Sequence, residues 1–220
     1  MLINSLKKLQ AFGFKPKNIL DIGANKGKWS LEIKKKLFPN AEYTLIEAID
    51  YKELKQISAK NHNISILNLL LDELEHTVTW YEKKNTGDSI YKENTAYFED
   101  CEQYERKTTT LDKNFSSSND FDLIKIDCQG AELPILRGGK NLVQSASVII
   151  LEVPFMGEYN IGVPNFFEHI KYMDQIDYRV FDIVELHRVN DILIQIDLIF
   201  IKKGHYFEKS VNKIIQNLGR

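Results

Sequence analysis

The chain has 220 residues, 43% of them apolar, so it is long enough to bury one sizeable core. Its 29 basic and 31 acidic side chains nearly balance, which leaves no basic field to attract nucleic-acid phosphates or an anionic membrane surface. We therefore expect a single domain over residues 1–220, with neither a nucleic acid nor a membrane as its partner.

The N-terminal segment and the cysteines bear on the cellular compartment. The segment MLINSLKKLQAFGF alternates apolar and basic residues at helical spacing, and it lacks the apolar core and cleavage site of a secretion signal. No apolar run in the sequence approaches the roughly 18 residues of a membrane span. Cys101 and Cys128 have neither metal-ligand spacing nor the density of a disulfide framework. These features predict a cytoplasmic protein with free thiols.

The first part of the chain alternates strand and helix patterns. Strands are expected at residues 18–23, 42–48 and 64–73, with helices at about 26–37 and 51–61 between them. This alternation is typical of parallel strands joined by crossover helices. The following stretch HTVTWYEKK alternates in the manner of an edge strand, whereas Lys84–Lys107 is polar, tyrosine-rich and weakly periodic. We expect Lys84–Lys107 to form an insert or a lid near the functional site.

The alternation resumes in the second half. Strands are expected at residues 121–129 and 147–153, and helices at about 132–143 and 165–176. Two long strands then follow, joined by a turn near Asn190 and Asp191, and they need no crossover and can be antiparallel. The sequence thus predicts an α/β fold: a mostly parallel sheet of about seven strands, helices on both faces, and an antiparallel hairpin at one edge.

An acidic residue ends each of the five strands expected to be parallel. These residues are Asp21, Glu47, Asp72, Asp127 and Glu152. In an open α/β sheet, ligands bind outside the carboxyl ends of the strands, near the point where the strand order reverses. A single acid at such a place is equally well explained as a helix cap, but recurrence at every strand end favours a shared binding site.

The turn after the first strand narrows the ligand class. It contains only Gly23 and Gly27, so it is not the three-glycine dinucleotide fingerprint, and no Gly-Lys-Ser/Thr follows as in a P-loop. A pyrophosphate would be repelled by the carboxylates around it. S-adenosylmethionine fits better, because a carboxylate can address its sulfonium, its amino group and its ribose diol.

Four stretches together carry a family resemblance. DIGANKGKWS, LIEA, DLIKIDCQGAELPILRGG and VIILEV, over roughly residues 18–153, resemble the FkbM family of S-adenosylmethionine-dependent methyltransferases, and IDLIFIKK resembles the final strand of that family. The resemblance implies a Rossmann-like class I methyltransferase fold. It also implies S-adenosyl-L-methionine as the cofactor.

The resemblance also implies roles for individual residues. Those it places around the cofactor are Asp21, Gly23, Ala24, Asn25, Gly27, Glu47, Asp72 and Asp127. The first turn would hold the amino-acid end, Glu47 the ribose hydroxyls and Asp72 the adenine amino group. Asp127, with Gly130 and Glu132, would lie where the methyl group meets its acceptor. Gln129 stands where the family usually has glutamate, which removes one carboxylate from the acceptor side.

For catalysis we expect three candidates. Asp127 is the first choice for a general base or for orienting the acceptor, Glu132 is the second, and His187 in the late hairpin is the third. Lys125 lies inside an apolar run, so it either extends out beside a helix or pairs with the acidic cluster. Tyr91, Tyr97 and Tyr104 of the insert either stack on a sugar as a lid or pack at the surface. No residue spacing requires a metal.

The family resemblance favours O-methylation of a hydroxyl on a sugar, a glycan or a small metabolite. Two alternatives stay open from the sequence. One is a methyltransferase-fold module that binds without turnover. The other is a nucleic-acid methyltransferase. It is disfavoured because the fourth strand ends in Ile-Asp-Cys-Gln and not in the Asn/Asp-Pro-Pro-aromatic turn of amino-methylating DNA enzymes, and because the net charge is −2. The expected partner is a small-molecule or glycan acceptor, and self-association into a homo-oligomer is left open.

Overall fold

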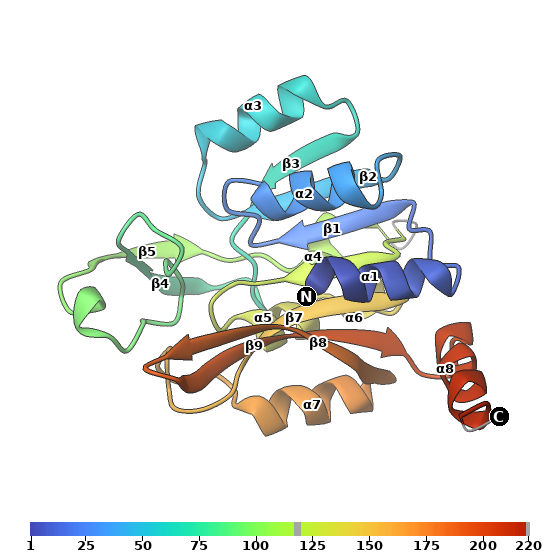
Figure 1. Ribbon diagram of the computed structural model, residues 1–220. Coiled ribbons are helices and arrows are strands. Elements are labelled where there is room, and N and C mark those ends of the chain that lie inside the picture. The colour runs from blue at the N-terminus through green and yellow to red at the C-terminus, as the bar shows by residue number, and fades with distance from the viewer. Residues whose placement is uncertain (117–119, 219–220) are drawn as a thin grey trace.

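Seven strands form one central sheet in the computed structural model, which describes residues 1–116 and 120–218 (Figure 1). The strands are β1 (Asn18–Ile22), β2 (Glu42–Glu47), β3 (Ile64–Asn68), β6 (Leu123–Ile126), β7 (Val148–Pro154), β8 (Tyr178–Val189) and β9 (Ile192–Lys202). Their order across the sheet is β3-β2-β1-β6-β7-β9-β8. The first five run parallel, whereas β9 is antiparallel to both β7 and β8. The predicted architecture is confirmed.

Helices cover both faces of this sheet (Figure 1). One face carries α1 (Leu2–Ala11), α2 (Lys28–Lys36), α3 (Lys52–Lys60) and α8 (Tyr206–Gln216), and the other carries α4 (Leu111–Asn114), α5 (Glu132–Arg137), α6 (Lys140–Val143) and α7 (Phe166–Gln175). Within the described ranges, no helix is both long enough and apolar enough to cross a membrane.

The buried strands supply side chains to both layers. In β1, Ile19 packs into the core cluster under α1 and α2, while Leu20 and Ile22 pack into the opposite cluster under α5 and α6. All three side chains are buried, and each contributes about 1.5–3 kcal/mol by leaving water. Burial on two faces explains why these strands appear in the sequence as continuous apolar runs.

Several predicted elements have different bounds, and the fourth strand, expected over residues 121–129, spans only Leu123–Ile126. The third strand ends at Asn68, and residues 69–71 leave the sheet, so Asp72 does not end a strand as expected. The helix expected over residues 132–143 is broken into α5 and α6 at Gly138 and Gly139. A Cβ on Gly138 would lie 2.3 Å from the carbonyl oxygen of Asp72, so only glycine allows the chain to turn there.

The stretch expected to be an edge strand does not join the main sheet. It forms β4 (Thr77–Glu82), which pairs in antiparallel register with β5 (Glu102–Lys107) in a separate two-stranded sheet. The short 3-10 helix η1 (Ala96–Phe98) lies between them in sequence. Figure 1 shows this small sheet beyond the carboxyl ends of the parallel strands. The inserted unit therefore begins at β4, earlier than the predicted Lys84.

The hairpin at the other edge follows its turn chemistry. Asn190 and Asp191 both have positive φ, at 48° and 64°, which suits a two-residue turn between antiparallel strands. The turn brings the polar residues of β8 and β9 alongside the end of β7, where Glu152 lies opposite Asp197 in the strand register. The hairpin therefore places side chains from β8 and β9 beside the carboxyl ends of the parallel strands.

Candidate functional site

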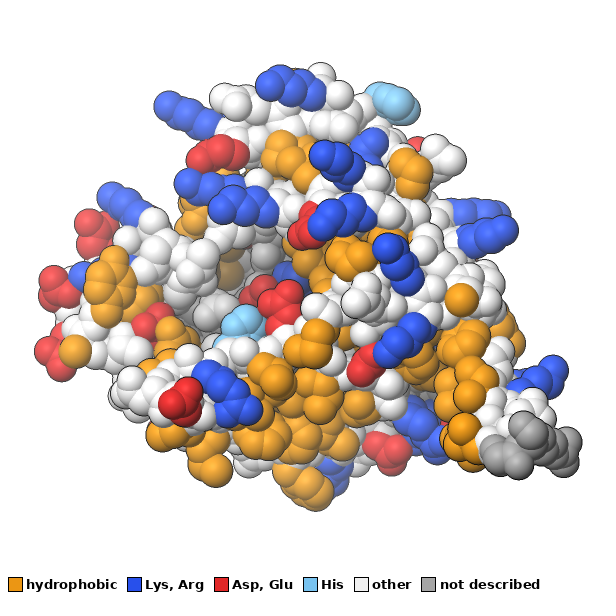
Figure 2. Space-filling model, viewed as in Figure 1, with side chains coloured by type: hydrophobic (Ala, Val, Ile, Leu, Met, Phe, Trp, Pro, Cys, Tyr) orange, Lys and Arg blue, Asp and Glu red, His pale blue; other side chains and the backbone are white. Residues whose placement is uncertain are grey.

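A cavity of about 360 Å³ opens at the carboxyl ends of the central parallel strands. It lies where the strand order reverses between β1 and β6, the usual ligand position in open α/β sheets. Leu69, Leu70, Leu71 and Ile135 supply apolar wall, and Glu47 supplies a carboxylate. Figure 2 shows a hollow in which acidic side chains and a histidine lie together. The size and mixed lining suit a small organic ligand.

The turn after β1 is fixed between its two neighbouring strands. The backbone amides of Gly23 and Ala24 donate to the carbonyl oxygen of Ile46 at 3.0 and 3.1 Å. Gly23 has φ +75°, and a Cβ built on it would lie 1.9 Å from the carbonyl oxygen of Asp127. Glycine is therefore required both by the left-handed backbone and by the close approach of the turn to the end of β6.

Replacing Gly23 with alanine is expected to lower the free energy of unfolding by about 3 kcal/mol or more, because the backbone of β6 must shift. The matched control is Gly157→Ala, at φ +78° with no atom of the described residues within 4 Å of its Cβ position. That control should lose only the 1–2 kcal/mol or so of a left-handed non-glycine residue. Urea denaturation compares the two variants, and equal losses would show that the contact with Asp127 is unimportant.

Glu47, at the end of β2, presents a fixed carboxylate to the cavity. Its Oε2 accepts a hydrogen bond from the Asn25 amide at 2.7 Å, and its Oε1 accepts one from the Ile49 amide at 2.9 Å. Burial raises the pKa of this carboxyl, and the backbone donors oppose that shift. Each oxygen keeps further acceptor capacity, so the group is oriented to accept hydrogen bonds from a diol.

Asp21 lies behind the cavity wall. Its side chain is fully buried on the face covered by α2, its Oδ2 accepts a hydrogen bond from the Ser30 hydroxyl at 2.6 Å, and burial raises its pKa. The Lys125 ammonium lies 3.9 Å from Oδ1. Asp21 does not line the cavity and anchors α2 beneath the turn, so its contact with the amino-acid end of the cofactor stays a prediction.

Lys125 pairs with the acidic residues Asp21 and Asp127, as the second of its two sequence interpretations predicted. Its Nζ lies 2.9 Å from Asp127 Oδ2 and 5.8 Å from the centre of the Trp29 ring, and the side chain is buried. Burial alone would raise the pKa of Asp127, but the Lys125 ammonium outweighs it and holds that pKa below its ordinary value. Asp127 is therefore a carboxylate at neutral pH and a weak base.

The loop after β6 is tied together by side chains that follow Asp127. The Gln129 amide donates to Asp127 Oδ1 at 3.2 Å and to Glu152 Oε2 at 2.8 Å. Glu132 Oε1 accepts from the backbone amides of Cys128 and Gly130, and burial raises its pKa to about 7. Glu132 lines only a small adjacent cavity of about 10 Å³, so it supports the loop and lies outside the main cavity.

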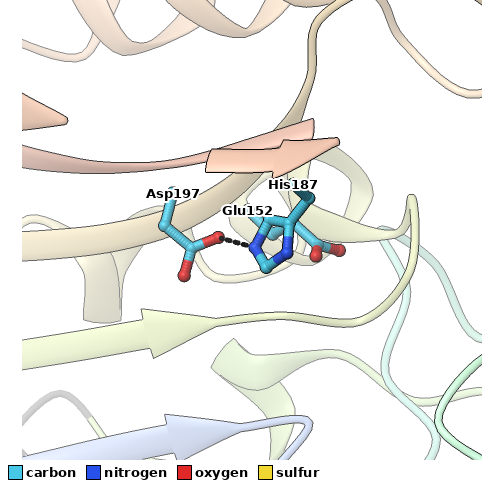
Figure 3. Close-up of side chains that lie close together, drawn as sticks. All are labelled: Glu152, His187 and Asp197. Atoms are coloured by element: carbon cyan, nitrogen blue, oxygen red, sulfur yellow. Dashed lines mark ion pairs between the residues drawn. The ribbon is translucent and has the colours of Figure 1, made fainter. Parts of the chain in front are cut away.

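A second cluster closes the cavity from the side of the hairpin. Glu152 from β7, His187 from β8 and Asp197 from β9 lie close together in Figure 3, where a dashed line joins Asp197 to His187. His187 Nε2 lies 3.4 Å from Asp197 Oδ1 and 3.8 Å from Glu185 Oε2, and the Asp197 contact chiefly raises the His187 pKa. Burial, together with the carboxylates of Asp127, Glu132 and Asp197, raises the pKa of Glu152.

Asp197 is a site residue that sequence reasoning missed. The available signal was an acid inside the apolar run IDLIFIKK, the same kind of signal that singled out Lys125. Both side chains are buried, and each lies in a strand whose neighbours are aliphatic. A charged residue that interrupts a buried strand is therefore worth including among candidate site residues.

The inserted unit contacts the cavity through residues other than its tyrosines. Asn85, Asp88 and Ser89 line it, and the Ser89 hydroxyl donates to the carbonyl oxygen of Gln129 at 3.0 Å. Tyr97 and Tyr104 are exposed at the surface, and Tyr91 packs against the core. The interpretation of these tyrosines as a stacking lid is wrong for this structure, because none of them lines the cavity.

Asp72 is engaged away from the cavity. Its Oδ1 accepts a hydrogen bond from the Glu73 amide and its Oδ2 lies 2.7 Å from His76 Nε2. The wall position expected for Asp72 is taken by Leu69, Leu70 and Leu71. An apolar wall suits the face of a base, while the contact of Asp72 with an adenine amino group stays a prediction without geometric support.

The structure thus divides the predicted residues into two groups. Gly23, Asn25, Glu47, Asp127 and His187 line the cavity, whereas Asp21, Ala24, Gly27, Asp72 and Glu132 lie behind its wall. Gly27 begins α2 at φ +69°, and its Cβ position is 2.8 Å from Ile57 Cδ1, so it serves helix packing. The second group shapes the turn and the loops that hold the first.

Residues 21–180 match the Methyltransferase FkbM domain. The chain belongs to the FkbM methyltransferase family. A comparison of this FkbM chain with curated protein sequences gives no significant match. The family resemblance drawn from the turn after β1 and the loop after β6 is confirmed.

Solved structures show the fold that this FkbM protein shares. N-methyltransferase NodS from Bradyrhizobium japonicum WM9, in complex with S-adenosylhomocysteine, has TM-score 0.53 at 13% identity, over 92% of this chain and 86% of that chain. Magnesium protoporphyrin IX methyltransferase (ChlM) from Synechocystis PCC 6803, with bound S-adenosylmethionine, has TM-score 0.53 at 10% identity, over 92% and 78%. The N-terminal domain of EvdMO1, with S-adenosylhomocysteine and D-fucose, has TM-score 0.51 at 10% identity, over 91% and 82%. The predicted class I methyltransferase fold is confirmed.

Proposed function

We propose that this FkbM protein transfers a methyl group from S-adenosylmethionine to a hydroxyl group of a sugar, a glycan or a small metabolite. The observation that carries the proposal is the carboxylate of Glu47, which two backbone amides fix on the wall of a cavity at the switch point of the sheet. Family membership supports methyl transfer. The presence of D-fucose with a protein of the same fold supports a sugar acceptor.

The residues of the cavity fit this cofactor. Glu47 would accept hydrogen bonds from the ribose hydroxyls, and the leucine wall at residues 69–71 would pack against the adenine. Gly23 and Asn25 line the cavity where the amino-acid end of S-adenosylmethionine is expected to lie, and their backbone would face it. When bound, S-adenosylmethionine supplies a methyl group on a positively charged sulfur. The surrounding carboxylates favour such a cation electrostatically.

The acceptor side must hold a hydroxyl and receive its proton. Bound S-adenosylmethionine would supply the methyl group to the acceptor oxygen and would leave as S-adenosylhomocysteine, and the proton of the hydroxyl would go to a base. Asp127 lies at this junction of the cavity and is ionised, so it can orient the hydroxyl and take the proton. Its low pKa makes it a weak base, and a second group must make the hydroxyl more acidic.

Two other functions are separated from this one by experiment. An N-methyltransferase would use an amine acceptor, the class of acceptor that the name of NodS implies for that protein. A binding module would hold S-adenosylhomocysteine and methylate nothing. The acceptor-side carboxylates and His187 favour catalysis over binding alone, because a module that only held the cofactor has no use for them.

The test is calorimetric titration with S-adenosylhomocysteine, followed by mass spectrometry of matched hydroxyl and amine panels that include D-fucose. We expect binding, and a product that gains one methyl group only among the hydroxyl compounds. Methylation confined to amines would replace the O-methyltransferase proposal, binding without any product would favour the module, and an absence of binding would overturn both.

The Asp127→Asn variant tests the acceptor role. We expect kcat to fall about 100-fold or more while the dissociation constant for S-adenosylhomocysteine changes little, because the variant keeps the side-chain shape and loses the proton acceptor. The matched control is Asp174→Asn, an exposed carboxylate on α7, which should leave both values unchanged. Weaker cofactor binding at constant kcat would place Asp127 on the donor side instead.

A further inference from the structure

We propose that Glu152, His187 and Asp197 bind a divalent cation of the Mn²⁺ type, which holds two neighbouring oxygens of the methyl acceptor. The three residues are hereafter the hairpin cluster. The role for the acceptor rests on the proposed function, whereas the cation site itself stands on the geometry of the cluster. With such a cation, the protein would have a metal site, and its methyl acceptors would be compounds with adjacent hydroxyl groups.

The hairpin cluster has the geometry of a cation site. One ligand atom from each residue lies within 4.8 Å of the others, and the residues come from three adjacent strands. Glu152 lies directly opposite Asp197 in the register of β7 and β9, so hydrogen-bonded backbone fixes their spacing. Neighbouring ligands of an octahedral ion at about 2.1 Å are about 3 Å apart, and small side-chain rotations close the remaining gap.

Asp197 supplies an independent observation. Its side chain is buried, and its Oδ1 receives no hydrogen bond from any residue in the described ranges. Its closest charged partner there is His187 Nε2 at 3.4 Å, which lies beyond good hydrogen-bond length. A buried carboxylate oxygen that has no donor carries a desolvation cost. A cation between Asp197 and Glu152 would remove that cost.

The nearby donors are committed elsewhere. Lys125 pairs with Asp127 and Asp21, and the Gln129 amide reaches only one oxygen of Glu152. The side of the cluster that faces the cavity is formed by Glu152 and His187, which both line it. A bound ion would therefore have its remaining coordination positions directed toward the space where the acceptor must lie.

The ligand set indicates the kind of ion. Two carboxylates and one imidazole combine the oxygen donors preferred by Mg²⁺ and Mn²⁺ with a nitrogen donor that favours a transition metal, and Mn²⁺ satisfies both. Three protein ligands leave about three positions of an octahedral ion, enough for two acceptor oxygens and a water. A coordinated hydroxyl becomes more acidic, so the weak base Asp127 is then sufficient to accept its proton.

The cation site is tested by electron paramagnetic resonance of Mn²⁺ titrated into the full chain without cofactor. We expect the six-line signal of free Mn²⁺ to disappear up to one equivalent. Asp197→Asn and His187→Gln should each weaken Mn²⁺ binding at least tenfold. The matched control is Glu185→Gln, which removes a carboxylate 3.8 Å from the same His187 nitrogen but outside the hairpin cluster, and it should bind as the wild type does.

Two results would overturn the cation site. One is that Mn²⁺ added to the wild type at millimolar concentration stays free. The other is an equal loss of Mn²⁺ affinity in Glu185→Gln and Asp197→Asn, which would indicate only diffuse negative charge. Titration of every variant with S-adenosylhomocysteine separates this outcome from failure of the proposed function. Unchanged cofactor affinity shows that a variant is folded and that the donor half of the cavity is intact. If only the cation site fails, the methyltransferase proposal stands.

Discussion

Glu47→Gln is expected to weaken S-adenosylhomocysteine binding about 30- to 100-fold, a loss of about 2–3 kcal/mol. In the wild type, the Glu47 carboxylate oxygens accept hydrogen bonds from the backbone amides of Asn25 and Ile49, and each oxygen can accept a further hydrogen bond from a ribose hydroxyl. Glutamine keeps one acceptor oxygen, and its NH2 group faces a backbone donor whichever way the amide is turned. Isothermal titration calorimetry measures the change directly.

The matched control for this prediction is Glu42→Gln, which makes the same chemical change at the exposed start of the same strand. Its cofactor affinity should equal that of the wild type. Thermal unfolding of both variants must show that β2 is retained. A Glu47→Gln variant that is folded and binds S-adenosylhomocysteine normally would remove Glu47 from the donor site and with it the observation on which the proposed function rests.

Lys125→Met is expected to lower the free energy of unfolding by about 3–5 kcal/mol near pH 8. The substitution keeps much of the side-chain volume and removes the only ammonium that lies within 4 Å of Asp21 and Asp127 among the described residues. The buried carboxylate of Asp21 and the partly buried carboxylate of Asp127 would then lack their counter-charge. Urea denaturation measures the loss, and the exposed Lys36→Met on α2 is the control for a lysine-to-methionine change.

The loss should depend on pH with a definite sign. In the wild type the folded pKa of Asp127 is below its ordinary value, so this carboxylate stabilises the fold above its unfolded pKa near 4 and stops doing so as the pH falls through the folded value. Without Lys125, burial raises the pKa of Asp21 and Asp127, so the folded state binds more protons than the unfolded state. The variant should therefore regain stability from pH 8 to pH 5.

A double variant completes this test. Lys125→Met combined with Asp127→Asn should recover part of the stability lost in Lys125→Met, because one of the uncompensated carboxylates is gone. A loss that is independent of pH, or a double variant that is as unstable as the sum of the single changes, would show that Lys125 matters for packing and not for charge.

The residues that the sequence could place are those whose position depends on local pattern. Glu47 and Asp127 follow apolar runs that become parallel strands, and parallel strands bring their carboxyl ends to one edge, so both were expected at the cavity and both line it. Gly23 follows the same rule, because it stands directly after the first of these strands, and it lines the cavity too.

Other placements depend on features that a single sequence does not contain. Asp21 lies between Leu20 and Ile22 on β1, so its side chain points to the opposite face of the sheet, toward α2. The sequence alone does not show that the cavity lies away from that face. Asp197 reaches the site only through the register of β9 against β7 and β8. The pairing of β4 with β5 in place of the main sheet follows from the departure of residues 69–71 from β3, which no local periodicity marks.

The contact between Gly23 and the Asp127 carbonyl bears on how this protein could change its substrate. Because backbone meets backbone there, the turn after β1 and the loop after β6 form one rigid unit that tolerates little exchange of sequence. The β8–β9 hairpin and the segment at residues 85–90 also contribute side chains to this cavity, and both lie outside the close contact between Gly23 and Asp127. Grafting these two segments between relatives is therefore the economical route to new acceptor ranges, with the donor half inherited unchanged.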